Sequence, residues 1–336
     1  MFLGATRMEI YEGPGDSATE IAWFARAFRE IVASIGNVVA GKTDQITNAV
    51  ICLFAGGHLL IEDVPGVGKT SLARGIAESI DGTCRRLQFT PDLLPSDITG
   101  VTIYHQRRQE FEFHPGPVFS NVVICDEINR ASPKTQSALL EVMEESHVSV
   151  DGVTHPVPLP FMVVATQNPV DLDGTYALPE AQLDRFLLRL HLGYPDEDTE
   201  MGILTGGTPG SRQRHVSRVL TGKEVSAMIR VASRVHATEE IRRYTVRLVA
   251  ATRNREDVRL GASPRGSIAL LRAAQVRAAA WGREFVIPED IQELAIPVLA
   301  HRIMLSPEAE LGGLNDADIV KDLLRSVPVP RSLARR

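Results

Sequence analysis

A glycine-rich turn between a short apolar run and a helical pattern constrains the fold more than any other part of the sequence. The apolar run is His58–Glu62, and the next eight residues, Asp63–Thr70, read Asp-Val-Pro-Gly-Val-Gly-Lys-Thr. Glycines let successive backbone N–H groups surround a phosphate, because no side chain blocks its approach, and the start of a helix adds partial positive charge. A strand, a Gly-x-Gly-Lys-Thr turn and a helix in this order predict a P-loop that binds a nucleoside triphosphate.

The P-loop prediction assigns roles to individual residues. Lys69 is expected to reach the β- and γ-phosphates of ATP, and the Thr70 hydroxyl is expected to ligate Mg²⁺. The template begins with Gly where this chain has Asp63. The alternative is an ordinary strand-to-helix turn with an exposed lysine, which does not explain why Lys-Thr follows the glycines directly. The expected nucleotide-binding residues are Val64, Pro65, Gly66, Val67, Gly68, Lys69, Thr70 and Ser71.

A second motif places two adjacent carboxylates at the end of another apolar run. Val122–Cys125 is followed by Asp126 and Glu127, 57 residues after Lys69. Open α/β sheets bind ligands at the carboxyl ends of their strands. We therefore expect Asp126 to hold Mg²⁺ and Glu127 to act as the general base that polarises the attacking water. An Asp-Glu pair after a strand can also be a simple loop boundary, but its position after the P-loop favours the functional interpretation.

Apolar runs alternate with helical patterns over the first two thirds of the chain. Buried strands separated by helices are typical of a parallel sheet covered on both faces, so we predict an α/β domain with about five parallel strands. Two additional segments, 92–117 and 148–157, do not belong to such a sheet and are expected to form hairpins, the second around Asp151-Gly152. The expected strands are 58–62, 85–90, 121–125, 161–165 and 187–192.

Beyond a stretch rich in Gly, Pro and Ser, the chain has helical patterns only. A Thr221/Glu224 capping box opens the first of them. The expected helices are 221–234, 239–254, 264–281 and 288–295. The predicted organisation is a flexible N-terminal tail at 1–17, an α/β core at 18–205, a linker at 206–215, and a helical lid at 216–336 that ends in a C-terminal tail.

The charge distribution supports two units. Residues 1–205 carry 14 Lys and Arg against 28 Asp and Glu, whereas residues 206–336 carry 22 against 14. Opposite signs allow an electrostatic contact between the acidic and basic parts, although two independently solvated surfaces would give the same counts. Aromatic residues make up only 5% of the chain, which argues against nucleic-acid binding by base stacking.

The remaining composition favours a soluble cytoplasmic protein. Cys52, Cys84 and Cys125 have neither disulfide-framework nor metal-ligand spacing, which fits a reducing compartment. The N-terminal residues lack the pattern of a signal peptide, and the most apolar stretch, 46–61, is too short and too interrupted to span a bilayer. We therefore expect no membrane insertion.

Three further strings resemble one known family. They are Asp126–Ala131 (Asp-Glu-Ile-Asn-Arg-Ala), Gln136–Glu141 (Gln-Ser-Ala-Leu-Leu-Glu) and Leu178–Phe186 (Leu-Pro-Glu-Ala-Gln-Leu-Asp-Arg-Phe). With the two motifs above, which look like Walker A and Walker B, they are very similar to the MoxR subfamily of AAA+ ATPases over residues 20 to 305. The resemblance implies a P-loop AAA+ core with a parallel five-stranded sheet, followed by a small all-α lid. It also accounts for both surplus hairpins, which the related magnesium-chelatase and helicase branch carries as insertions.

The resemblance implies roles for four more residues. Asn168 matches sensor 1, an amide that orients the lytic water beside Glu127. Arg185 matches the arginine finger, which stabilises charge on the γ-phosphate of a neighbouring subunit. Arg265 matches sensor 2, which contacts a γ-phosphate of its own chain or of the next one, an alternative the sequence leaves open. Val39 resembles an adenine-contacting position, although core packing explains a valine there equally well.

The function that the resemblance implies is Mg²⁺-dependent hydrolysis of ATP by a homo-oligomeric ring, expected to be a hexamer. MoxR-like proteins act as chaperones that remodel, mature or insert metal into a client complex, together with a separate von Willebrand A domain protein. The alternative is a nucleic-acid motor of the related helicase branch. Residues 144–158, which include the second hairpin, contain no Lys or Arg, and a hairpin that grips a phosphate backbone would need them.

Overall fold

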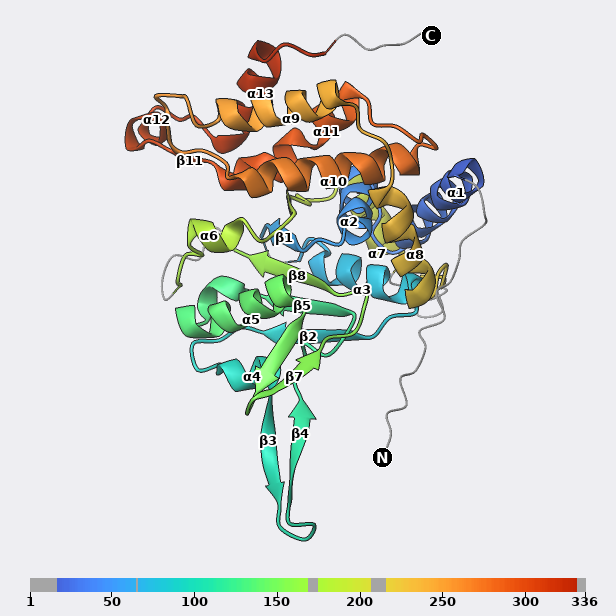
Figure 1. Cartoon of the computed structure of the whole chain (residues 1–336), viewed down its shortest axis with the longest axis vertical. Coiled ribbons are helices and arrows are strands. Elements are labelled where there is room, and N and C mark those ends of the chain that lie inside the picture. The colour runs from blue at the N-terminus through green and yellow to red at the C-terminus, as the bar shows by residue number, and fades with distance from the viewer. Residues whose placement is uncertain (1–16, 65, 169–174, 207–215, 331–336) are drawn as a thin grey trace.

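The computed structural model describes residues 17–64, 66–168, 175–206 and 216–330 (Figure 1). Residues 1–16 of the predicted tail and residues 207–215 of the predicted linker lie outside this part of the chain. Pro65, which we expected to bind nucleotide, also lies outside it.

The centre of the molecule is a sheet of five parallel strands, as predicted. Its spatial order is β2-β5-β8-β1-β9. All four pairings are parallel, so every strand ends at the same edge of the sheet. The first strand in sequence, β1, therefore lies beside β8, and β8 separates it from β5. The strands are β1 (Leu59–Glu62), β2 (Cys84–Gln88), β5 (Val122–Asp126), β8 (Met162–Gln167) and β9 (Leu188–Leu190).

Both faces of the sheet are covered, as the continuous apolar runs indicated. Alternate residues of one strand enter different clusters: Leu59 and Ile61 pack on one face of the sheet, and Leu60 packs on the other. This division follows from the two-residue period of a strand. Helices α1 (Ser17–Gly36), α2 (Thr43–Phe54) and α3 (Lys69–Ser79) contribute to the first cluster, whereas α4 (Pro95–Thr99) and α5 (Pro133–Glu145) contribute to the second.

The two surplus segments form antiparallel hairpins, as predicted. Strands β3 (Gly100–His105) and β4 (Glu110–Pro115) project away from the body of the molecule (Figure 1). Strands β6 (His147–Val150) and β7 (Val153–Pro156) are joined by Asp151 and Gly152, both with positive φ. Two consecutive residues with positive φ are what a tight type I′ turn requires, so the Asp-Gly signal identified the turn correctly.

The described C-terminal part is mostly helical. It also contains a short antiparallel pair, β10 (Val258–Leu260) with β11 (Met304–Leu305), and an isolated bridge between His236 and Phe285, which we did not predict. The Thr221 capping box is present: the Glu224 amide donates to Thr221 Oγ1 (3.4 Å), and the Glu224 carboxylate accepts from the Thr221 amide (2.7 Å). The helices of this part are α8 (Gly222–Ser233), α9 (Glu239–Ala251), α10 (Pro264–Ala280), α11 (Pro288–Leu299), α12 (Pro307–Leu311) and α13 (Asp316–Ser326).

Helix α12 was not predicted, and two longer helices also differ from the prediction. Helix α11 continues beyond the predicted end at residue 295, through an internal Pro297, because Val298 and Leu299 are buried. Helix α13 was not predicted, yet it buries Ile319, Val320 and Leu323. Packing against α11 explains why α13 forms.

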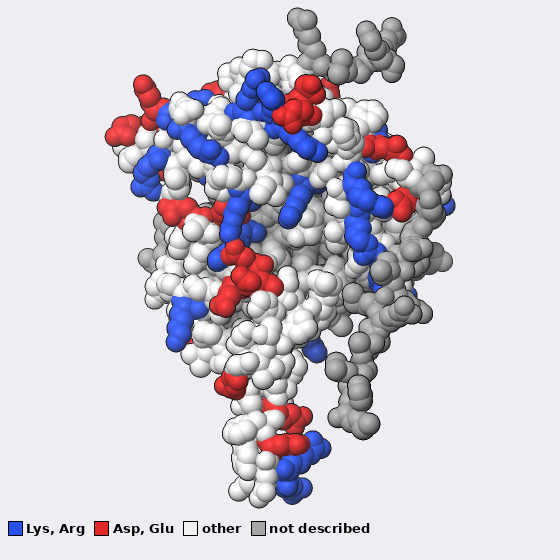
Figure 2. All heavy atoms as spheres, viewed as in Figure 1, with Lys and Arg blue, Asp and Glu red and all other residues white. Residues whose placement is uncertain are grey.

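The lid packs directly on the core. One apolar cluster runs from α1 and α2 through the sheet into α10 and α11, so the first two helices of the described chain are tied to the lid. Figure 2 shows Lys and Arg gathered over the lid helices, with a group of Asp and Glu below them. None of the helices in the described part of the chain combines the length and the apolar composition of a membrane-spanning segment.

His58 is a buried titratable group at the start of β1. The Val163 amide donates to its Nδ1 atom (3.0 Å), so its proton is on Nε2, which donates to the Met143 carbonyl (3.1 Å). The ring of Phe161 lies edge-on to the imidazole. Burial lowers the pKa of His58 to about 4, because the charged form would lose its hydration there.

We predict that this histidine makes the fold sensitive to acid. The folded pKa of about 4 lies below the ordinary value of 6.5, so the unfolded chain binds the extra proton between these two values. Stability is therefore lost as the pH falls through that window, by up to about 3 kcal/mol from this group. Urea unfolding at pH 7.5 and at pH 5 measures the loss. His58→Asn should show a smaller pH dependence, and an equal dependence in both proteins would contradict the assignment.

Candidate active site

The carboxyl edge of the sheet collects residues from distant parts of the sequence. Strands β1 and β5 both pair with β8, in register with Leu60 and Ile124 opposite Ala165 and Val164. Because the strands are parallel, the P-loop after β1, Asn168 after β8 and the Asp126-Glu127 pair at the end of β5 reach the same edge. The three predicted elements therefore meet at one place.

The P-loop glycines leave open space at the start of α3. Gly66 and Gly68 have φ of +88° and +95°, and no heavy atom lies within 4 Å of where a Cβ would stand on either residue. Positive φ is a conformation that side-chain-bearing residues rarely adopt. This geometry fits a group that approaches the backbone closely, as a phosphate does. Lys69 donates from Nζ to the Asp63 carbonyl (2.8 Å).

Lys69 lies within electrostatic reach of the second motif. Partial burial lowers the pKa of its ammonium, while the carboxylates of Asp63, Asp126 and Glu127 act in the opposite direction. The Lys69 ammonium is therefore close enough to Asp126 and Glu127 for their negative charges to stabilise it. A site that held the lysine far from Asp126 would not show this coupling.

Both oxygens of the buried Asp126 carboxylate have partners. Arg86 Nε donates to Oδ2 (2.6 Å), and Thr166 Oγ1 donates to Oδ1 (3.3 Å). The Glu127 amide in turn donates to Thr166 Oγ1 (3.0 Å), so one hydroxyl on β8 connects both acidic residues. Neither Arg86 nor Thr166 was predicted from the sequence. Thr166 lies in the same short string as Asn168, but no spacing rule marked it.

Glu127 has a left-handed backbone, with φ 58° and ψ 50°. This conformation costs a side-chain-bearing residue about 1 kcal/mol, and such strain is common at functional sites. The carboxylate is held from two sides: Gln88 Nε2 donates to Oε2 (2.9 Å), and Arg130 Nε lies 3.2 Å from the same oxygen. Gln88 was also missed. The only available signal was that it falls on the same face of β2 as Arg86.

The other predicted nucleotide residues occupy less distinctive positions. Asn168 follows β8 directly and is half-buried. Val39 is 6% exposed and belongs to the apolar cluster, so packing accounts for it, and its contact with adenine stays a prediction. Thr70, predicted to bind metal, is in the first turn of α3. The half-buried residues of the P-loop segment are Val64, Val67, Gly68, Lys69, Thr70 and Ser71.

Asp63, which departs from the P-loop template, has a structural role. Its Oδ2 accepts hydrogen bonds from the amides of Leu192 and Gly193, the latter at 3.0 Å. Its carboxylate therefore joins the P-loop to the chain that leaves β9. A glycine at this position could not make that connection.

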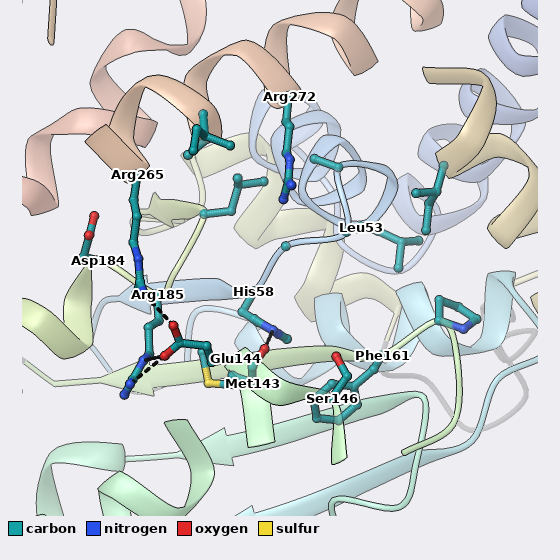
Figure 3. Close-up of a pocket in the computed structure, with 18 of the residues that line it drawn as sticks. Leu53, His58, Met143, Glu144, Ser146, Phe161, Asp184, Arg185, Arg265 and Arg272 are labelled. Atoms are coloured by element: carbon teal, nitrogen blue, oxygen red, sulfur yellow. Dashed lines mark hydrogen bonds and ion pairs between the residues drawn. The ribbon is translucent and has the colours of Figure 1, made fainter. Parts of the chain in front are cut away.

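Arg185 and Arg265 lie at the opposite, amino edge of the sheet. They line a cavity of about 590 Å³ between the core and α10, which also includes His58 before β1 and Phe161 before β8 (Figure 3). Both side chains contact one carboxylate, that of Glu144 near the end of α5. Arg185 Nη2 is 2.7 Å from Oε2, and Arg265 Nη2 is paired with Oε1. These contacts hold the pKa of Glu144 below its ordinary value.

The separation of the two edges decides what each arginine can reach. Strand β1 alone, with four residues, separates the edges by roughly 13 Å. The P-loop begins beyond one end of that strand, and Arg185 and Arg265 lie at the other. The carboxyl edge therefore carries the glycine turn and the acidic pair, whereas the amino edge carries a convergent pair of cations.

Comparisons with known proteins agree with this architecture. Residues 58–188 match the ATPase family associated with various cellular activities (AAA), and residues 250–323 match the AAA lid domain. The chain is 49% identical to the uncharacterized protein YeaC of Bacillus subtilis (strain 168), with 89% of this chain and 93% of YeaC covered. It is 38% identical to Chaperone MoxR1 of Mycobacterium tuberculosis (98% and 89% covered) and 34% identical to Protein MoxR of Paracoccus denitrificans (92% and 97%). A crystal structure from Cytophaga hutchinsonii, 38% identical, superposes with a TM-score of 0.87 over 93% of this chain and 97% of that one.

We predict that returning the template residue at position 63 harms the protein. Asp63→Gly leaves the amides of Leu192 and Gly193 without their acceptor and adds backbone freedom, which should cost about 2 kcal/mol of unfolding free energy. Urea unfolding measures this loss. Asp63→Asn keeps one acceptor oxygen in place and should lose clearly less. Equal stability of the glycine variant and the wild type would show that the two bonds contribute nothing.

Proposed function

Because the chain belongs to the MoxR family of AAA+ ATPases, we propose that it binds Mg²⁺–ATP at its P-loop and hydrolyses it at an interface between two copies. The observation that carries this proposal is the distribution of the site over two edges of one sheet. The glycine turn and the acidic pair lie at one edge, and the Arg185–Arg265 pair lies at the other. A second copy of the chain would bring the two halves together.

The carboxyl edge supplies the binding and base functions. The backbone around Gly66 and Gly68 would surround the phosphates, and Lys69 would turn from the Asp63 carbonyl toward them. Thr70 and Asp126 would hold Mg²⁺, which when bound neutralises charge on the phosphates. The fit is chemical, since a hydroxyl and a carboxylate are the oxygen donors that Mg²⁺ prefers.

Glu127 would accept a proton from the attacking water, which Asn168 would orient. Gln88 and Arg130 hold the Glu127 carboxylate, so its direction is set before any substrate arrives. The Asp126 oxygen that now accepts from Arg86 would exchange that partner for the metal. The Arg86 side chain is 53% exposed and can move into solvent at the edge of the sheet.

The amino edge supplies the cations. Arg185 would stabilise the charge that develops on the neighbour's γ-phosphate. Arg265 contacts the same carboxylate as Arg185, so we assign it to the neighbour's nucleotide too, which is one of the two alternatives that the sequence left open. The basic lid and the acidic core would favour such a contact between adjacent copies (Figure 2).

A heterologous interface of this kind closes into a ring when the rotation permits. We propose a hexameric, cytoplasmic ring that uses ATP to remodel or mature a client complex, with a von Willebrand A domain protein as partner. The name of the relative Chaperone MoxR1 supports the chaperone role. A nucleic-acid motor is less well supported, because the β6–β7 hairpin carries no Lys or Arg to meet phosphates.

We predict that Glu127→Gln separates binding from turnover. The amide keeps the size of the side chain but cannot take a proton, so phosphate release should fall roughly 100-fold or more. Binding of a fluorescent ADP analogue should stay near the wild-type value. Similar phosphate release from both proteins would end the assignment of Glu127 as the base.

We predict that two inactive variants restore activity when mixed. Arg185→Ala should lower turnover by roughly 1,000-fold, because the cation that offsets transition-state charge is lost. Lys69→Ala should be inactive because it does not bind ATP productively. In mixed assemblies, the P-loop of an Arg185→Ala copy can meet the intact Arg185 of a Lys69→Ala copy. Phosphate release well above that of either variant alone is expected, and no recovery would mean that Arg185 does not act across an interface.

A further inference from the structure

The two arginines that meet at Glu144 come from parts of the chain 80 residues apart. Arg185 lies in the core between α6 (Glu180–Leu183) and β9, and Arg265 lies in the first turn of the lid helix α10. A cation pair that serves one phosphate needs a fixed spacing, since a displacement of 1 Å costs about 100-fold in rate. Glu144 holds only the tips of the two side chains, so another contact has to fix the segments that carry them.

Asp184 joins the bases of both arginines. It precedes Arg185 directly, and its Oδ2 accepts from the Ser263 hydroxyl (2.8 Å). Ser263 is the N-cap of α10, and its oxygen accepts from the Arg265 amide (3.0 Å). The Asp184 carboxylate is therefore adjacent in sequence to Arg185, and the Ser263 hydroxyl connects it to the backbone of Arg265.

Arg302 secures Asp184 from the lid. Its Nε donates to Asp184 Oδ1 (2.8 Å), and its side chain is only 2% exposed. Most other contacts of the guanidinium are to backbone carbonyls of the turn around Arg185, and Nη1 also contacts the Val298 carbonyl and His301 Nε2 (2.8 Å). Nη2 donates to Phe186 (2.6 Å) and Asp184 (3.3 Å), and Nη1 donates to Leu187 (3.3 Å). A buried guanidinium is tolerated only when its donors are satisfied, and here most of the acceptors belong to the segment that carries Arg185.

We propose that Asp184 and Arg302 are positioning residues that set the spacing of Arg185 and Arg265, so that one copy presents both cations to its neighbour as a rigid pair. We call the contact of Asp184, Arg302 and Ser263 the clasp. This inference rests on the proposed function, because it concerns the half of the site that acts on the neighbour's nucleotide. Without the clasp, a small rotation of the lid would carry Arg265 away from Arg185 while leaving the P-loop untouched.

Asp184→Asn tests the clasp with the smallest change in shape. It removes the charge that pairs with Arg302 and weakens acceptance from Ser263. We expect turnover by assemblies of this variant to fall roughly tenfold to 100-fold, the loss that displaced catalytic groups produce. Binding of a fluorescent ADP analogue to the unassembled chain should be unchanged, because the P-loop lies at the other edge. Wild-type turnover would overturn the proposal.

Mixing with Lys69→Ala separates positioning from general damage. If the clasp serves only the neighbour, a mixture of Asp184→Asn and Lys69→Ala should recover phosphate release. With equal amounts and random order, about a quarter of the interfaces join a working P-loop to a working cation pair. Arg185→Ala with Lys69→Ala is the reference. Recovery in the reference but not with Asp184→Asn would overturn the clasp, whereas no recovery in the reference would overturn the proposed function on which it rests.

Two further variants complete the experiment. Asp257→Asn breaks another ion pair of the lid, in which Arg255 Nη2 lies 2.6 Å from Oδ2, and it should leave turnover within twofold of wild type. Arg302→Lys keeps the positive charge but loses the planar set of guanidinium donors that bond to the turn around Arg185. It should behave like Asp184→Asn in the mixing experiment. If Asp257→Asn lowered turnover as much as Asp184→Asn, the effect would not be specific to the clasp and the proposal would fail.

Discussion

Parallel pairing of β1 with β8 and of β8 with β5 is the constraint on which the rest of the structure depends. It gives the three strands one direction, so everything that follows them lies at one edge and everything that precedes them at the other. The P-loop and the acidic pair follow their strands, whereas the turn that carries Arg185 precedes β9. A single antiparallel strand among them would move part of the site to the wrong edge.

The proposed division of the active site would tie catalysis to assembly. In the single chain, each half is paired internally: Arg86 contacts Asp126, Lys69 contacts a carbonyl, and Glu144 contacts both cations. These contacts leave no bare charge in a partly buried place, which would be costly. They are also exposed enough to be exchanged, since the Arg265 side chain is 52% exposed. The clasp differs in this respect. The Arg302 side chain is buried and its donors have hydrogen-bond acceptors, which suits a contact that persists when a neighbour binds.

Much of the fold followed from local sequence. Asp151-Gly152 identified one hairpin, Thr221 and Glu224 identified a helix start, and alternating apolar runs predicted the parallel sheet. Each of these signals depends on residues within a few positions of one another. Helix α13 and the β10–β11 pair escaped prediction because they depend on packing against α11 and on pairing across 44 residues or more. The end of α11 was misplaced because burial of Val298 and Leu299 outweighs the proline inside the helix.

The same division applies to the candidate site. The sequence alone determined the glycine turn and the acidic strand end, because each pattern is complete within eight residues and needs only a strand before it. Tertiary structure decided which distant side chains serve them: Gln88 on Glu127, Thr166 between Asp126 and Glu127, and Arg302 on Asp184. It also decided that Arg185 and Arg265 share Glu144 away from their own P-loop. Contacts between segments 40 to 120 residues apart depend on how helices and strands pack, and no local pattern records that.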